Sequence, residues 1–220
     1  MDLAQLADQF GERHILAAGG FLIGMLFGAL AQRSRFCLRA ATIEFGRGQI
    51  GGRVAVWVLV FSSAVFFTQL AVRTGLIDVS EARQLAAQGS LSGAIIGGLM
   101  FGTGMILARG CASRLLVLSA TGNLRALVTG MVLTVFAQAS LRGILAPLRE
   151  ELWSIWTIPG GASRDLLAQI GAGPSTGIGL GLLWLLTGIW LARRYRVSRI
   201  VAFAASGVGL AIALGWLFTY

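Results

Sequence analysis

Six long apolar stretches, separated by short polar connections, dominate the pattern of the chain. Each holds 17 to 21 residues, enough for an α-helix to cross about 30 Å of hydrocarbon. They run uniformly apolar rather than alternating with polar positions as membrane β-strands do. The pattern predicts an all-α polytopic membrane protein with about six transmembrane helices, at Ile15–Ala31, Val54–Val72, Leu91–Ala108, Leu124–Leu141, Ser175–Ala192 and Ile200–Tyr220.

Composition supports the membrane class and excludes several others. Of 220 residues, 56% are hydrophobic and only 12% are charged, about half the charged fraction of a soluble domain. A cytosolic enzyme, a disordered regulator and a nucleic-acid binder are therefore excluded, despite a net charge of +9. The expected surroundings are membrane lipid, and no nucleic acid partner is expected.

Basic and neutral connections alternate along the chain. Arginines stand almost without acidic neighbours in 32–53, 109–125 and 193–199, whereas 73–90 and 142–165 also carry aspartate and glutamate. Because basic loops stay on the cytoplasmic side, this alternation places both termini on the outer face. The predicted location is the bacterial inner membrane.

The remaining segments define the predicted domain organisation. Residues 1–14 lack the basic flank of a signal peptide and are expected to form an amphipathic lead-in. Residues 15–220 are expected to form a single transmembrane domain. Within it, 142–174 contains Trp153 and Trp156 and is predicted to be an outer interfacial loop, because tryptophan concentrates at membrane surfaces.

An internal repeat appears when the chain is shifted by about 74 residues on itself. Small residues let membrane helices approach closely, which explains the glycines of each copy but not its Arg-x-Cys ending. The repeat units are 15–53 and 91–125. The matching residues are Gly19, Gly24, Phe27, Gly28, Arg35 and Cys37 in the first copy, and Gly93, Gly98, Phe101, Gly102, Arg109 and Cys111 in the second.

The second cysteine begins a short apolar segment, Cys111–Thr121, bounded by Arg109-Gly110 and by Gly122-Asn123. As a helix it spans only about 16 Å, half a bilayer. A short helix of this kind is typical of re-entrant segments that line a cavity, and its N-terminus favours an anion. Phe36–Phe45 is predicted to be a first copy of the same half-helix.

Several roles remain open for the two cysteines. They can pack as small hydrophobes, while a cytoplasmic location disfavours a disulfide. Two cysteines and the distant His14 do not make a metal ligand set, and Cys37 and Cys111 lack a base for hydrolysis. No catalytic residue, metal or cofactor is therefore predicted.

A thiol beside arginines at a helix N-terminus suits a small anion with soft, polarizable atoms, and so favours sulfur anions. The arginines have a second possible role, as charges that set the topology. The candidate substrate-binding residues are Cys37, Cys111, Gly110, Arg35, Arg109 and Ser113.

Two stretches carry a resemblance to a known family. Gln32-Arg-Ser-Arg-Phe-Cys-Leu-Arg-Ala-Ala41 and Gly102-Thr-Gly-Met-Ile-Leu-Ala-Arg-Gly-Cys-Ala-Ser113 resemble the signatures of the YeeE/YedE proteins, which transport thiosulfate and other sulfur compounds. The resemblance implies an all-helical, pseudo-symmetric fold. It also implies uptake of a thiosulfate-like anion, whose terminal sulfur accepts hydrogen bonds from Cys37 and Cys111.

The resemblance also leaves alternatives. It covers roughly residues 15–140, and Arg109 and Arg114 replace small residues of the family pattern. Long members have a second half with another Gly-Cys unit, so this chain is expected to be a fragment, or to pair with itself or with a second half-transporter chain. Two other functions stay open: a membrane subunit that passes a persulfide to a cytoplasmic sulfur-carrier protein, and a purely structural subunit.

Overall fold

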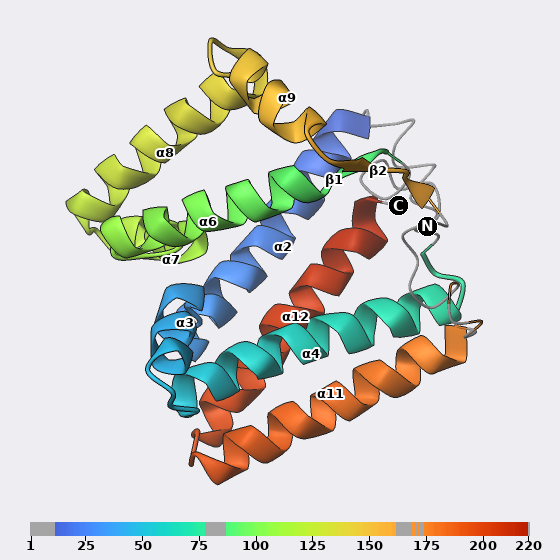
Figure 1. The fold of residues 1–220 in the computed structure, drawn as a ribbon. Coiled ribbons are helices and arrows are strands. Elements are labelled where there is room, and N and C mark those ends of the chain that lie inside the picture. The colour runs from blue at the N-terminus through green and yellow to red at the C-terminus, as the bar shows by residue number, and fades with distance from the viewer. Residues whose placement is uncertain (1–11, 78–86, 162–168, 170, 172–173, 220) are drawn as a thin grey trace. The chain divides into compact units, whose positions relative to one another are not determined.

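The computed structural model describes residues 12–77, 87–161, 169, 171 and 174–219, and these are mostly helical (Figure 1). Two short strands also form, β1 (Gly89–Ser90) and β2 (Thr157–Ile158). The short helices are α3 (Leu38–Gly46), α7 (Ala112–Ala120) and α9 (Ala146–Ser154). The long helices are α2 (Glu12–Ser34), α4 (Gly52–Arg73), α6 (Leu91–Leu107), α8 (Leu124–Arg142), α11 (Pro174–Arg194) and α12 (Arg199–Thr219).

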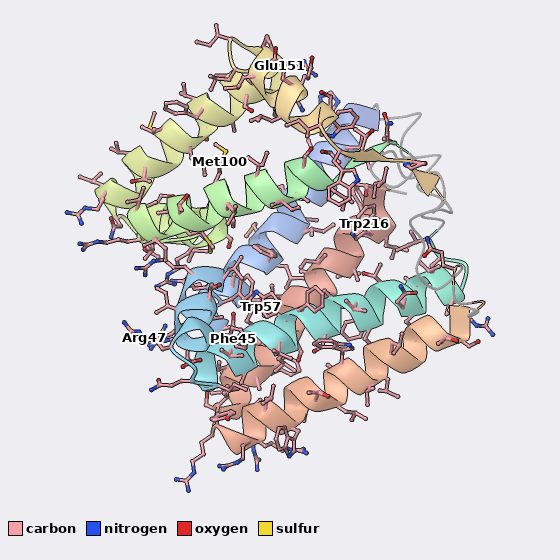
Figure 2. All side chains as sticks on the ribbon, in the orientation of Figure 1. Phe45, Arg47, Trp57, Met100, Glu151 and Trp216 are labelled. Carbon is pink, nitrogen blue, oxygen red and sulfur yellow. The ribbon has the colours of Figure 1, made fainter. Side chains whose placement is uncertain are left out.

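The six predicted spans are confirmed as helices. Each lies in a helical stretch that is long and apolar enough to cross a membrane, so the chain is a multi-pass helical membrane protein. Large apolar side chains lie exposed on these helices, among them Leu107 and Phe203, as expected where lipid replaces water. Figure 2 shows that side chains of this kind extend outward along most of the ribbon.

The predicted lead-in and interfacial loop are only partly described. Residues 1–11 lie outside the described part, and α2 already begins at Glu12. The segment 142–174 contains α9 and β2, followed by residues that are mostly outside the described part. The lead-in, the interfacial position of the loop and the single transmembrane domain stay predictions.

The chain forms two compact units, and α2, α4, α11 and α12 belong to the first. In this unit α4 packs against both α11 and α12, and α12 also packs against α2. The buried face of α4 combines Val and Leu side chains with smaller ones, and Ser62 and Ser63 are buried there. Their hydroxyl groups donate to the Leu59 carbonyl of their own helix at 3.2 and 2.7 Å, so burial leaves neither hydroxyl unsatisfied.

The second unit comprises Cys37–Gln49 and Ser80–Ile170. Here α7 packs along α8, α8 leads into α9, and α9 returns to α6 (Figure 1). The short helix α3 contacts α6 in the same unit. Both cysteine-bearing half-helices, α3 and α7, therefore belong to one unit although they are far apart in the sequence.

Serine hydroxyl groups join the start of α6 to the end of α9. The Ser90 hydroxyl accepts from the Gly93 N–H at 2.8 Å and donates to the Trp153 carbonyl at 2.6 Å. The Ser92 hydroxyl donates to the Leu152 carbonyl at 2.7 Å. Helix ends leave backbone groups without intrahelical partners. These two serines supply partners for an N–H group at the start of α6 and for two carbonyl groups at the end of α9.

Candidate functional site

The two copies of the internal repeat have the same local structure, because the same turn precedes α3 and α7. Arg35 and Arg109 have left-handed backbones, with φ of 52° and 56°. Their N–H groups donate to the carbonyls three residues earlier, at 3.2 and 3.3 Å. Two residues later a cysteine occupies the N-cap position, and a helix of nine residues follows. The predicted half-helices are confirmed, with ends within two residues of those expected.

In the turn before α7, the left-handed residue is an arginine and not the neighbouring glycine. Arg109, rather than Gly110, has the positive φ, a conformation that glycine adopts far more readily than other residues. Gly110 is buried, and a Cβ there would lie 3.3 Å from Leu115 Cδ2. Gly110 therefore provides room for the first turn of α7, while Arg109 adopts the left-handed turn.

Substitutions at Arg109 should separate its charge from its backbone conformation. Arg109→Gly is expected to raise the free energy of unfolding by up to about 1 kcal/mol, because it relieves left-handed strain. Arg109→Val should lower it by about 1–2 kcal/mol, because β-branched residues tolerate this region poorly. Thermal unfolding in detergent measures both. As a control, Arg125→Gly removes the same charge from inside α8 and should destabilise the protein; equal effects at both positions would contradict the backbone explanation.

Cys37 and Cys111 are weak caps of their helices. They occupy the N-cap positions of α3 and α7, and each thiol approaches the backbone three residues later, at Ala40 and Arg114, without making a regular capping hydrogen bond among the described residues. By contrast, Ser90 caps α6, Asn123 caps α8 by accepting from the Ala126 N–H at 3.1 Å, and Ser198 accepts from the Val201 N–H at 3.4 Å. Oxygen-bearing side chains are the favoured N-caps, so capping alone does not explain cysteine at these two positions.

The two thiols face each other. The side chains of Cys37 and Cys111 lie within hydrogen-bonding range, and the Cys111 thiol also approaches the backbone of Leu38, the first residue of α3. The Cys111 Sγ lies 3.4 Å from the Ser113 Oγ. Cys111 is 4% exposed and Cys37 is partly buried, and both are free thiols. The repeat therefore brings its two cysteines to one place.

The surroundings of the thiols favour negative charge. The first turns of α3 and α7 contain no acidic residue, and helix N-termini carry partial positive charge from their N–H groups. Two such termini meet at the thiol pair, which adds S–H donors and polarizable sulfur. Among the described residues no group of three or more His, Cys, Asp or Glu could hold a metal ion. The arrangement suits a small anion with a soft end.

The other predicted site residues occupy different places. Ser113 joins the thiol pair through Cys111, and Gly110 forms the turn beside it. Arg35 and Arg109 are exposed at their turns. Arg39 is not among the predicted site residues, but its Nε is buried and makes no hydrogen bond to any described residue. Its position two residues after Cys37, within a candidate span, is the feature of the sequence that could have marked Arg39 as a candidate.

The spanning helices and the repeated half-helices define a polytopic helical membrane protein built on an internal repeat. A model described as sulphur transport matches residues 33–216, and the chain belongs to this family. The resemblance to the YeeE/YedE proteins is thereby confirmed.

A curated relative is similar over part of the chain. The thiosulfate transporter TsuA of Spirochaeta thermophila is 36% identical over 96 residues. This match covers 43% of the present chain and 27% of the relative's length.

Proposed function

We propose that this protein transports thiosulfate, or a related small sulfur-containing anion, across the bacterial inner membrane. The observation that carries the proposal is the pair of facing thiols at two half-helix N-termini. Membership of the sulphur transport family and the similarity to a thiosulfate transporter support the same substrate class. No catalytic step, metal or cofactor forms part of the proposal.

The binding chemistry follows from the two half-helices. A divalent sulfur anion that loses water at membrane depth needs hydrogen-bond donors and positive potential in exchange. The N-termini of α3 and α7 supply the potential, and Cys37 and Cys111 donate S–H hydrogen bonds to the terminal sulfur. Because these bonds are weak, the ion can pass from one thiol to the next without a covalent intermediate. Ser113 orients the Cys111 thiol.

The exposed arginines and the topology complete the proposal. Arg35 and Arg109 raise the local concentration of anions at the ends of their helices. The alternation of basic and neutral connections places these turns on the cytoplasmic side and both termini on the outer face. A second copy of the chain, or a second half-transporter chain, is the proposed protein partner.

Radiolabelled thiosulfate uptake tests the proposal. Cells without their own sulfate and thiosulfate importers should take up thiosulfate when they express the native chain. Cells expressing the double variant Cys37→Ala, Cys111→Ala at equal membrane abundance should not. Uptake that survives loss of both thiols would reject the thiol pathway. If the native chain shows no uptake, even when a candidate partner is co-expressed, the transport proposal itself is rejected.

The facing thiols also support a second candidate, transfer of sulfane sulfur. In that reaction the Cys111 thiolate attacks the outer sulfur of thiosulfate, the S–S bond breaks, and sulfite leaves with the bonding electron pair. The product is a persulfide on Cys111, which Cys37 is placed to accept before a cytoplasmic sulfur carrier. Mass spectrometry of thiosulfate-treated protein should then show one added sulfur atom, and an unchanged mass excludes this candidate.

A further inference from the structure

Arg39 has an unsatisfied buried donor close to the candidate site. It is the second residue of α3, two positions after Cys37. Its Nε is buried and has no hydrogen-bond partner among the described residues. The residue also lies inside the candidate span His14–Gly46. A charged group whose buried donor lacks an acceptor is costly.

An unpaired buried N–H needs an explanation. Most buried polar groups in proteins have a partner, and a donor on a charged group loses more than a neutral one when it is left without an acceptor. Glu44 lies on the same helix, yet the Arg39 Nε has no partner among the described residues. The missing acceptor therefore lies outside the described residues, and a bound anion is one group that can supply it.

The internal repeat indicates which side of the helix this position occupies. The shift that aligns Cys37 with Cys111 aligns Arg39 with Ser113. In α7 the side chain at this position turns back to its own N-cap, where the Ser113 Oγ lies 3.4 Å from the Cys111 Sγ. The equivalent position in α3 belongs to Arg39, which is longer and carries a positive charge. By the repeat, Arg39 holds the same place relative to Cys37 that Ser113 holds relative to Cys111.

We propose that Arg39 is the oxyanion-binding residue of this site: its Nε–H donates to an oxygen of the bound anion, while Cys37 and Cys111 hold the anion's terminal sulfur. This inference rests on the proposed function and specifies which end of the ion each residue recognises. A guanidinium group suits oxyanions because its planar N–H groups donate in a fixed geometry. The thiols suit the softer sulfur.

The division of roles has a consequence for selectivity. Thiosulfate carries both an oxygen-bearing end and a terminal sulfur, so it satisfies Arg39 and the thiols together. Thiocyanate offers a soft sulfur without oxygens, and sulfate offers oxygens without a soft sulfur. A site that holds Arg39 and the thiol pair therefore prefers thiosulfate to either ion. Loss of Arg39 should reduce this preference rather than lower the affinity for every anion equally.

Binding to the purified full-length chain tests the role of Arg39. Radiolabelled thiosulfate is titrated onto detergent-solubilised native protein, Arg39→Gln and Arg39→Lys, with thiocyanate and sulfate as competitors. Arg47→Gln is the matched control, since Arg47 is exposed at the C-cap of the same helix (Figure 2) and the substitution deletes the same charge. Gel filtration establishes that each variant is monodisperse, and thiosulfate uptake is measured in parallel.

Both Arg39 variants are expected to raise the thiosulfate Kd by about tenfold or more, the usual scale for losing a hydrogen bond to a charged group. The preference for thiosulfate over thiocyanate should fall with it, and Arg47→Gln should stay close to the native Kd. Native affinity in Arg39→Gln or Arg39→Lys, or equal losses for thiosulfate and thiocyanate, would overturn the inference. If the native chain transports thiosulfate in that case, the proposed function still stands; a native chain that neither binds nor transports it rejects both.

Discussion

Uptake of thiosulfate is expected to fall on the order of a hundredfold when Cys111 is replaced by alanine, the upper range for losing hydrogen bonds to a charged ligand. Cys111 lies at the centre of the site: it faces Cys37, contacts Ser113 and approaches the first residue of α3. Alanine removes the S–H donor and leaves the ion without a partner in a buried position. Because Cys37 is more exposed than Cys111, Cys37→Ala should cost less.

The comparison with serine distinguishes a donor from a nucleophile. Cys111→Ser keeps an O–H donor at the same position, so a hydrogen-bonding pathway should retain part of its uptake. A persulfide pathway has no use for a hydroxyl group and should lose all of it. Ser119→Ala is the control, because it changes a residue of α7 whose hydroxyl bonds only to the Leu116 carbonyl of its own helix, among the described contacts. Normal uptake by Cys111→Ala at equal expression would contradict the role of this thiol.

The long helices and the half-helices could be predicted because hydropathy and helix breaks act locally. A run of apolar residues must bond its own backbone groups in lipid, so a helix follows from composition alone. The 11-residue stretch between Arg109-Gly110 and Gly122-Asn123 could not span a bilayer, and the structure places α7 there. Gly122 behaves as expected, with a φ of 87°.

The details of the site depend on non-local features that single residues do not indicate. Arginine has no preference for left-handed backbone, so the positive φ of Arg35 and Arg109 is imposed by the turn between two helices. The sequence around Arg39 does not indicate that its Nε is buried. The repeat predicted that Cys37 and Cys111 enter the same region, but their contact requires the packing of the second unit. Sequence patterns thus predicted the elements and candidate residues, while packing determined which residues meet.

Helices α4 and α12 approach each other closely at Gly209, and this position should be sensitive to added volume. A Cβ added at Gly209 of α12 would lie 2.5 Å from the Ala64 backbone N and 2.7 Å from the Val60 carbonyl O of α4, and would also clash with the Ser63 hydroxyl. Backbone atoms cannot rotate away as a flexible side chain can, so α4 and α12 would have to separate. Small residues at such crossings allow membrane helices to pack closely.

Gly209→Ala is therefore expected to lower the free energy of unfolding by about 1–3 kcal/mol, the usual cost of overpacking, and Gly209→Leu should prevent recovery of folded protein. Thermal unfolding in detergent and gel filtration measure the two effects.

Gly215→Ala is the matched control on α12, because in the described structure a Cβ there has no neighbour within 4 Å. This substitution should stabilise the helix by up to about 1 kcal/mol. Ser63→Ala should fail to rescue Gly209→Ala, because the backbone contacts with α4 remain. Equal stability of the Gly209→Ala and Gly215→Ala variants would show that the two helices can separate without cost, contrary to the buried, small-residue interface that α4 and α12 share.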